Sequence, residues 1–209
     1  MKNIVLSILL MSACAMIYAQ ADSSPYQAIV AVDGSGDYKT VQEAINAVPD
    51  GQTKPWLILI KNGLYNEQVI IPKNKPYVHL IGQDKDKTII HLNLNVGSKL
   101  TGKEIGGKTA YWEHSVHNPS SPVYKYEGSV VVVKGDHFYT ENISYVNDWG
   151  VLSDNGPQAL AMNSQADCAS FYNCKFCSFQ DTWMTTNKST NRHYVKDCWI
   201  EGAVDYFYG

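Results

Sequence analysis

The chain has 209 residues, a net charge of −3, an apolar fraction of 44% and a charged fraction of 18%, which is the composition of an ordinary globular protein. These values exclude an intrinsically disordered chain, and the lack of a basic block argues against nucleic acid or an anionic membrane as partner. The length leaves room for one domain with a hydrophobic core.

The first 21 residues predict an export signal. Lys2 supplies the positive charge, residues 4–10 form the apolar run, and Ala19-Gln20-Ala21 is a small-residue cleavage site. The run is too short for a membrane-spanning helix. Cys14 leaves open a lipoprotein signal that would acylate it, although the residues after it stay apolar. We expect a secreted or periplasmic protein, with an outer-membrane lipoprotein as the alternative, in a compartment that permits disulfides.

Residues 22–209 are expected to form one domain, which begins with a short strand at 28–32 and a turn cluster at 33–37. A helix is then predicted to begin at Thr40, because Thr40 and Glu43 make a capping box and Pro49 follows the last apolar position. Its apolar positions fall on one face: Val41, Ala44, Ile45 and Val48. We expect this helix to cover one end of the fold.

From residue 56 onward, short apolar runs alternate with turn residues, and no helical pattern of useful length separates them. Strands without crossover helices favour an all-β fold. The runs are 56–60, 69–71, 78–81, 88–92, 130–133, 138–145, 159–162, 169–176 and 194–200.

The C-terminal part of the chain repeats. The segment 173–176 (NCKF) matches 197–200 (DCWI) after a shift of 24 residues, and the same shift carries Asp181 onto Asp205. Such repetition is typical of a β-solenoid, in which neighbouring coils pair as parallel strands about 4.8 Å apart. The sequence therefore predicts a parallel β-helix, with a β-sandwich as the alternative. Asp181 and Asp205 would face each other across one strand spacing, close enough to separate their pKa values and to take different roles.

Residues 93–128 interrupt this pattern with many glycines, prolines and serines, and we expect them to form a wall or lid of a binding cleft. His114 and His117 lie in this segment. Their spacing could supply half of a metal site, but no other ligand cluster accompanies them, so a pair of solvated loop residues is the favoured interpretation.

Four segments resemble, in order, the four signature segments of the pectinesterases, the carbohydrate esterases that demethylate pectin: residues 63–67 (GLYNE), 158–162 (QALAM), 180–183 (QDTW) and 205–209 (DYFYG). Residues 32–45 resemble the start of the family's domain, and 79–82 (HLIG) its first coil. The resemblance extends over residues 28–209. It implies a right-handed parallel β-helix with the N-terminal helix as its cap, which agrees with the interpretation of the repeat.

The resemblance also implies a hydrolysis without metal or cofactor that uses two carboxylates. Asp205 matches the nucleophile that attacks the C6 methyl ester of pectin and forms an acyl-enzyme anhydride. Asp181 matches the general acid that protonates methanol and then acts as base on water. Gln180 and Gln158 match the donors that stabilise the oxyanion. Tyr208 is the candidate for an aromatic residue that faces the sugar, and the protein is expected to be a monomer.

Each of these residues also has a structural interpretation. Aspartates often occupy β-helix turns, glutamines form stacked ladders, and Tyr65 and Glu67 are expected to serve packing and capping. Trp183 and Met184 depart from the residues usual after Gln-Asp-Thr, which suggests a changed sugar preference. The family's downstream arginine and tryptophan have no counterpart before Gly209, so we expect the chain as given to be an incomplete and inactive fragment.

Three other functions would require different residues. A non-catalytic carbohydrate-binding or cell-surface β-helix would not need both aspartates and both glutamines. A pectate lyase or polygalacturonase shares the fold, but a lyase would need a calcium-binding carboxylate cluster that the sequence lacks. A serine esterase would need a Gly-x-Ser-x-Gly motif, which does not occur in the chain.

The cysteines give one further expectation. Cys174 and Cys198 share a register one coil apart, at a Cα separation that a disulfide accepts, so we expect a bond between them. Cys168 and Cys177 have no partner in register and are expected to be buried as small apolar side chains.

Overall fold

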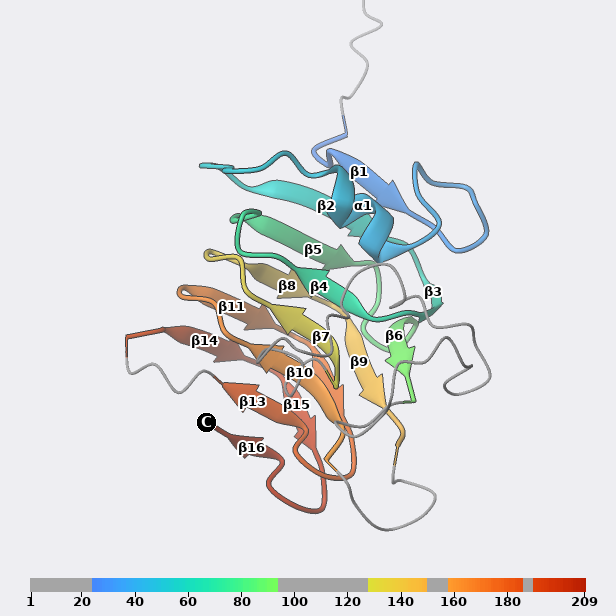
Figure 1. Cartoon of the computed structure of the whole chain (residues 1–209). Coiled ribbons are helices and arrows are strands. Elements are labelled where there is room, and N and C mark those ends of the chain that lie inside the picture. Colours follow the sequence, from blue (N-terminus) through green and yellow to red (C-terminus); the bar gives the residue numbers. More distant parts are fainter. Residues whose placement is uncertain (1–23, 94–127, 150–157, 186–189) are drawn as a thin grey trace, which may run out of the picture.

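The structure is a computed structural model that describes residues 24–93, 128–149, 158–185 and 190–209 (Figure 1). The export signal, the segment that contains His114 and His117, and Cys14 lie outside the described residues. Strands stack in coils along one axis. They are β1 (Ala28–Val30), β2 (Trp56–Ile60), β3 (Gly63–Asn66), β4 (Val69–Ile71), β5 (Val78–Gly82), β6 (Thr88–Leu92), β7 (Ser129–Val133), β8 (Tyr139–Glu141), β9 (Ser144–Asn147), β10 (Leu160–Ser164), β11 (Ala169–Tyr172), β12 (Lys175–Cys177), β13 (Trp183–Thr185), β14 (His193–Lys196), β15 (Trp199–Glu201) and β16 (Phe207–Tyr208).

The strands form three sheets. Sheet A has the order β1-β2-β5-β8-β11-β14, sheet B the order β15-β12-β9-β6-β3, and sheet C the order β16-β13-β10-β7-β4. The chain passes from sheet A to sheet B to sheet C and then begins the next coil. Neighbouring strands within the described residues pair in parallel, as β2 with β5, β12 with β15 and β13 with β16 illustrate. The fold is therefore a parallel β-helix, as the repeat predicts, and not a sandwich.

The repeat of 24 residues is confirmed in the last two coils. Ala169 pairs with His193, Lys175 with Trp199, and Trp183 with Phe207, one pair in each sheet. The preceding coil is longer, since Ser144 pairs with Lys175 at a separation of 31 residues. Extra residues enter at the corners between sheets, which explains why the repeat is visible only near the C-terminus.

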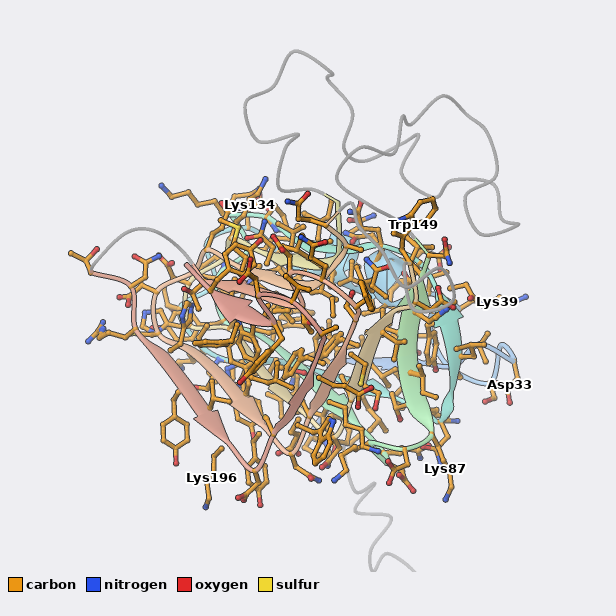
Figure 2. All side chains as sticks on the ribbon, turned by 90° about the horizontal axis from the view of Figure 1, so that it is seen from below. Asp33, Lys39, Lys87, Lys134, Trp149 and Lys196 are labelled. Atoms are coloured by element: carbon orange, nitrogen blue, oxygen red, sulfur yellow. The ribbon has the colours of Figure 1, made fainter. Side chains whose placement is uncertain are left out.

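Aromatic side chains fill the interior of the last coils, and Figure 2 looks along the stack into this core. The ring of Tyr145 stacks on Phe176 with centroids 5.3 Å apart, and the rings of Phe171 and Phe176 lie 4.6 and 4.3 Å from Trp183. Trp183 is 0% exposed. The expectation that Trp183 alters the sugar preference of a cleft is therefore wrong for this residue, because its indole is a core side chain.

The corners of the coil share one backbone conformation. Among the described residues, non-glycine residues with positive φ fall at equivalent corner positions of successive coils, where the left-handed conformation turns the chain from one sheet to the next. They are Tyr77, His137 and Cys168 between sheets C and A; Asn142, Asn173 and Asp197 between sheets A and B; and Asp181 and Asp205 between sheets B and C. Asparagine and aspartate tolerate this conformation better than most residues, which explains their frequency there.

The helix α1 (Val41–Ala47) closes the β1 end of the stack (Figure 1). Its capping box between Thr40 and Glu43 is formed as predicted. The buried carboxylate of Glu67 accepts hydrogen bonds from the backbone N–H groups of Val41 and Gln42, at 2.8 and 2.9 Å. The capping role expected of Glu67 is thus confirmed, and it ties the helix to the first coil. In the parts of the chain that the structure describes, no helix is long and apolar enough to cross a membrane.

The cysteine expectations need correction. Cys174 and Cys198 are both free thiols in this structure. The register brings them to adjacent coils, but each thiol donates to a backbone carbonyl, Cys174 to Tyr172 at 3.3 Å and Cys198 to Lys196 at 3.3 Å. Cys168 and Cys177 are half-buried rather than fully buried.

Candidate active site

The candidate site lies at the corner between sheets B and C, where β12 leads to β13 and β15 leads to β16. The backbone N–H of Asp181 donates to the carbonyl of Val204 at 2.9 Å, and the bridge between Gln180 and Val204 continues the pairing of β13 with β16. The register therefore sets Asp181 opposite Asp205. The two residues lie on adjacent coils, whose backbones are about one strand spacing, roughly 4.8 Å, apart.

Both aspartates have left-handed backbones, with φ of 63° at Asp181 and 45° at Asp205. A β-branched residue would be strained in this conformation, whereas aspartate adopts it readily. The corner geometry alone thus accounts for the residue type. What distinguishes these two aspartates has to come from their surroundings.

The surroundings of the Asp181 carboxyl are unusual for an aspartate. Asp181 is only 9% exposed. Burial raises the pKa of the Asp181 carboxyl, and the nearby charge of Asp205 raises it further. Hydrogen bonds from Tyr208 and Gln180 act in the opposite direction because they favour the ionised form, but the net shift in pKa is upward. The raised pKa favours the protonated form of Asp181, which a general acid requires.

The other predicted site residues lie around Asp181. Gln180 is half-buried and its side chain hydrogen-bonds to the Asp181 carboxyl. Gln158 is exposed and lies on the preceding coil, where the next residue, Ala159, donates its backbone N–H to the carbonyl of Gln180 at 3.1 Å. Tyr208 lies on β16, three residues after Asp205, and it lowers the pKa of the Asp181 carboxyl by favouring the ionised form. The structure thus brings Asp181, Gln180, Tyr208 and Asp205 together, with Gln158 one coil away.

Hydroxyl groups that the sequence analysis did not single out fix this corner. Thr182 Oγ1 donates to the carbonyl of Glu201 at 2.8 Å, which links the two coils beside the aspartates. A Cβ atom at Gly202 would lie 2.4 Å from Thr182 Oγ1, so this close approach requires glycine. Thr182 belongs to the Gln-Asp-Thr segment, which was the available signal for its role.

A polar cluster on the earlier coils was also not found from sequence. His91 Nε2 lies 2.8 Å from Asp148 Oδ2, His91 Nδ1 lies 2.9 Å from Asn66 Oδ1, and Asn93 donates to Asp148 Oδ1 at 2.7 Å. The neighbouring Trp149 lies at the outer edge of the coil (Figure 2). Within residues 24–93, 128–149, 158–185 and 190–209, no group of three or more histidine, cysteine, aspartate or glutamate side chains could hold a metal ion.

Comparison with known proteins agrees with this geometry. A family model described as Pectinesterase matches residues 27–105 and 106–209. The chain is 36% identical over 190 residues to a pectinesterase of Petunia integrifolia, an alignment that covers 91% of this chain and 43% of the Petunia protein. It is also 36% identical to a probable pectinesterase/pectinesterase inhibitor of Arabidopsis thaliana, over 87% of this chain and 27% of that protein.

Solved structures show the same relationship. The pectin methylesterase from carrot superposes with a TM-score of 0.69 and 29% sequence identity, over 90% of this chain and 50% of the carrot chain. The chain therefore spans half or less of the length of these relatives. Because the family model covers nearly all of residues 27–209, the chain belongs to the pectinesterase family.

Proposed function

We propose that the protein is a pectin methylesterase, which hydrolyses the C6 methyl esters of homogalacturonan and releases methanol. The observation that carries the proposal is the pair of aspartates in one register, of which Asp181 is buried with a raised pKa. An ester hydrolysis that uses two carboxyl groups needs one of them as an ionised nucleophile and the other as a protonated acid, and its burial and raised pKa suit Asp181 to the acid role. Membership of the pectinesterase family supplies the substrate class.

In the proposed first half-reaction, a carboxylate oxygen of Asp205 attacks the ester carbonyl. The carbon–oxygen bond to the methoxy group breaks, Asp181 gives its proton to the departing oxygen, and methanol leaves. Asp205 is then joined to the sugar's C6 carbonyl as an anhydride. Asp181, now ionised, can act as a base in the second half-reaction.

In the second half-reaction, Asp181 takes a proton from water as the water oxygen attacks the anhydride. The anhydride bond breaks, the galacturonic acid product leaves, and the carboxylate of Asp205 and the acid form of Asp181 are restored. The amide NH₂ groups of Gln180 and Gln158 would stabilise the oxyanion in both steps, since amides donate hydrogen bonds without competing as bases. The ring of Tyr208 would border the sugar.

Pectin is an extracellular polysaccharide, so this function requires the export that residues 1–21 predict. We propose a secreted or periplasmic monomer with pectin as its partner, and a lipid anchor at Cys14 as the alternative.

The test is methanol release by the protein as its gene encodes it, with its natural termini, from highly methylated homogalacturonan with and without EDTA. Fully demethylated polygalacturonate serves as the negative control. We expect methanol from the methylated polymer alone, at a rate that EDTA does not change. Failure to release methanol would favour a non-catalytic carbohydrate-binding β-helix, and loss of activity in EDTA would contradict a mechanism that uses only carboxylates.

A further inference from the structure

The candidate site residues come from three adjacent coils. Gln158 precedes β10, and Asp205 precedes β16. Gln180 and Asp181 lie between them, on the coil that leads to β13, and the three strands are neighbours in sheet C (Figure 1). The proposed reaction therefore depends on the alignment of one coil with the coils on both of its sides. A shift between coils would move the oxyanion donors, the acid and the nucleophile relative to one another.

Two buried hydroxyl residues, Ser178 and Thr182, flank the Gln-Asp pair in the sequence. Ser178 is 6% exposed and Thr182 is 0% exposed. The Thr182 hydroxyl reaches the following coil, where it donates to the carbonyl oxygen of Glu201 at 2.8 Å. The backbone N–H of Ser178 donates to the same carbonyl at 3.2 Å. Both ends of the segment are thus tied to the coil that carries Asp205.

The Ser178 hydroxyl reaches the opposite way, to the preceding coil. It donates to the carbonyl oxygen of Ala159, the residue directly after Gln158. The backbone N–H of Ala159 donates in turn to the carbonyl of Gln180 at 3.1 Å. One side-chain and one backbone hydrogen bond therefore hold the coil of Gln158 against the coil of Gln180.

The following coil leaves room for the Thr182 hydroxyl. A Cβ atom at Gly202 would lie 2.4 Å from Thr182 Oγ1, so a side chain at this position would push the hydroxyl away from Glu201. Because Thr182 is β-branched, its side chain has few accessible rotamers and its hydroxyl keeps one direction. A buried carbonyl that loses a donor is costly, so removal of either hydroxyl favours a shift of the neighbouring coil.

We propose that Ser178 and Thr182 are positioning residues. The Ser178 hydroxyl aligns its coil with the coil of Gln158, and the Thr182 hydroxyl aligns the same coil with that of Asp205. Both hydroxyls are buried, so they act on the reaction through the backbone that carries these groups and not through contact with the substrate. The catalytic meaning of the inference rests on the proposed function, whereas the alignment of the coils is measurable in the resting protein.

The test compares substitutions at the two positions with matched controls, all in the protein as its gene encodes it. Ser178→Ala is matched by Ser144→Ala. Ser144 is also a buried serine, and its hydroxyl donates to a backbone carbonyl of the preceding coil, that of Lys85, at 2.6 Å. This control lies beside the corner between sheets A and B, away from the candidate site.

Thr182→Val removes the hydroxyl and keeps the branched shape, and it is matched by Thr140→Val. Thr140 is likewise 0% exposed, and its hydroxyl lies 2.6 Å from the hydroxyl of Tyr145 in the core. A third variant, Thr182→Ser, keeps the hydroxyl and loses only the methyl group. It separates the contribution of the hydrogen bond from that of packing.

The first measurement is amide hydrogen exchange in the resting protein. The N–H of Ala159 reports on the preceding coil, and the N–H of Ala203, which donates to the carbonyl of Phe179 at 2.7 Å, reports on the following coil. We expect Ser178→Ala to speed exchange at Ala159 and Thr182→Val to speed exchange at Ala203, each roughly tenfold, the effect of one buried hydrogen bond. The matched controls should leave both rates unchanged.

The second measurement is steady-state methanol release per folded molecule. In Ser178→Ala and in Thr182→Val we expect kcat to fall roughly tenfold with little change in KM, because reacting groups are misaligned while substrate contacts remain. Thr182→Ser should restore most of kcat. Ser144→Ala and Thr140→Val should keep the kcat of the unmodified protein.

The two measurements separate failure of this inference from failure of the proposed function. A protein that releases no methanol, yet shows the faster exchange in the site variants, refutes the esterase proposal and upholds the alignment. Exchange rates that are the same in the site variants and their controls overturn the positioning role, whatever the activity. Equal losses of kcat in variants and controls, or no recovery of kcat in Thr182→Ser, also overturn it. If Thr182→Val does not fold, Ser178→Ala decides by the same criteria.

Discussion

The corner between sheets A and B and the corner between sheets B and C use the same left-handed backbone, but they place their side chains in different environments. At the first corner, Asn173 donates to Asn142 Oδ1 at 2.7 Å and accepts from Lys85 Nζ at 2.9 Å. The next position in this row is Asp197, which is exposed. The corner between sheets A and B thus carries two asparagines that hydrogen-bond to each other, followed on the next coil by an exposed aspartate.

At the second corner, the corresponding row contains two carboxyls, and one of them is buried. Burial and the charge of Asp205 raise the pKa of Asp181. The comparison shows that an aspartate at a β-helix corner is by itself a structural residue. In the proposed function, the chemistry arises where burial and a second carboxyl in register raise the pKa of one aspartate.

Among the substitutions that test the difference between the two corners, we expect Asp181→Asn to lower methanol release strongly. Asparagine keeps the left-handed backbone but cannot give or take a proton, so methanol release should fall by about 10²–10⁴-fold, the usual contribution of general acid–base catalysis. The reverse change at the other corner, Asn173→Asp, should leave turnover nearly unaffected. Steady-state methanol release measures both. Equal losses in the two variants would erase the distinction between the corners.

A somewhat smaller loss is expected from Gln180→Leu, which keeps the approximate volume and removes the amide. Loss of one oxyanion donor typically lowers kcat by about 10²–10³-fold. The fall should appear in kcat and in kcat/KM alike, because the oxyanion forms only during reaction. If the substitution instead raises KM alone, Gln180 binds the resting substrate and does not stabilise the oxyanion.

Glu67 is a buried carboxyl outside both corners, and it tests whether burial alone produces catalytic chemistry. Burial raises its pKa from 4.5 to about 7, against the hydrogen bonds from the helix N-terminus. Because the folded-state pKa lies above the unfolded one, the stability that Glu67 contributes is complete below pH 4.5 and is lost as pH rises through about 7.

We therefore expect the free energy of unfolding of the unmodified protein to fall by roughly 3 kcal/mol relative to Glu67→Gln across this range, while methanol release per folded molecule is the same in both. Urea denaturation at several pH values measures the slope. Identical slopes in the two proteins would mean that Glu67 is not the titrating group.

The smallest effect concerns the backbone that the two corners share. At Asp197, a change to valine should destabilise the protein by about 1–2 kcal/mol, because a β-branched residue is strained in the left-handed conformation. Asp197→Gly should be close to neutral, since glycine adopts this conformation freely. Thermal or urea unfolding distinguishes them. Equal stability of the valine and glycine variants would show that this corner does not require a left-handed residue.

Much of the fold and of the candidate site could be predicted because it depends on residue patterns that are local in the sequence. The capping box at Thr40 and Glu43, the register of Asp181 with Asp205, and the parallel β-helix each follow from spacings within one or two coils. Side-chain direction was harder to predict. A left-handed residue at position 181 interrupts the strand alternation, so sequence could not tell whether Trp183 faces the cleft or the core.

Two other features lay beyond sequence reasoning for similar reasons. The register places Cys174 beside Cys198, but it does not show that each thiol is directed at a backbone carbonyl. The contact between His91 and Asp148 joins residues 57 positions apart across the long excursion, where no repeat length is available to align the coils. Pairings across a variable insertion require the structure itself.

The most direct test of the contrast between the corners is to measure Asp205→Asn beside Asp197→Asn, for methanol release and for thermal unfolding. Both substitutions keep the left-handed backbone, and each removes one carboxylate from its own corner. We predict that Asp205→Asn loses nearly all turnover without a lower melting temperature, because a like charge beside Asp181 is removed, and that Asp197→Asn keeps its turnover. If Asp205→Asn retains more than about a tenth of the activity, a loss of only about 1.4 kcal/mol in transition-state stabilisation, Asp205 is not the nucleophile and the account is wrong.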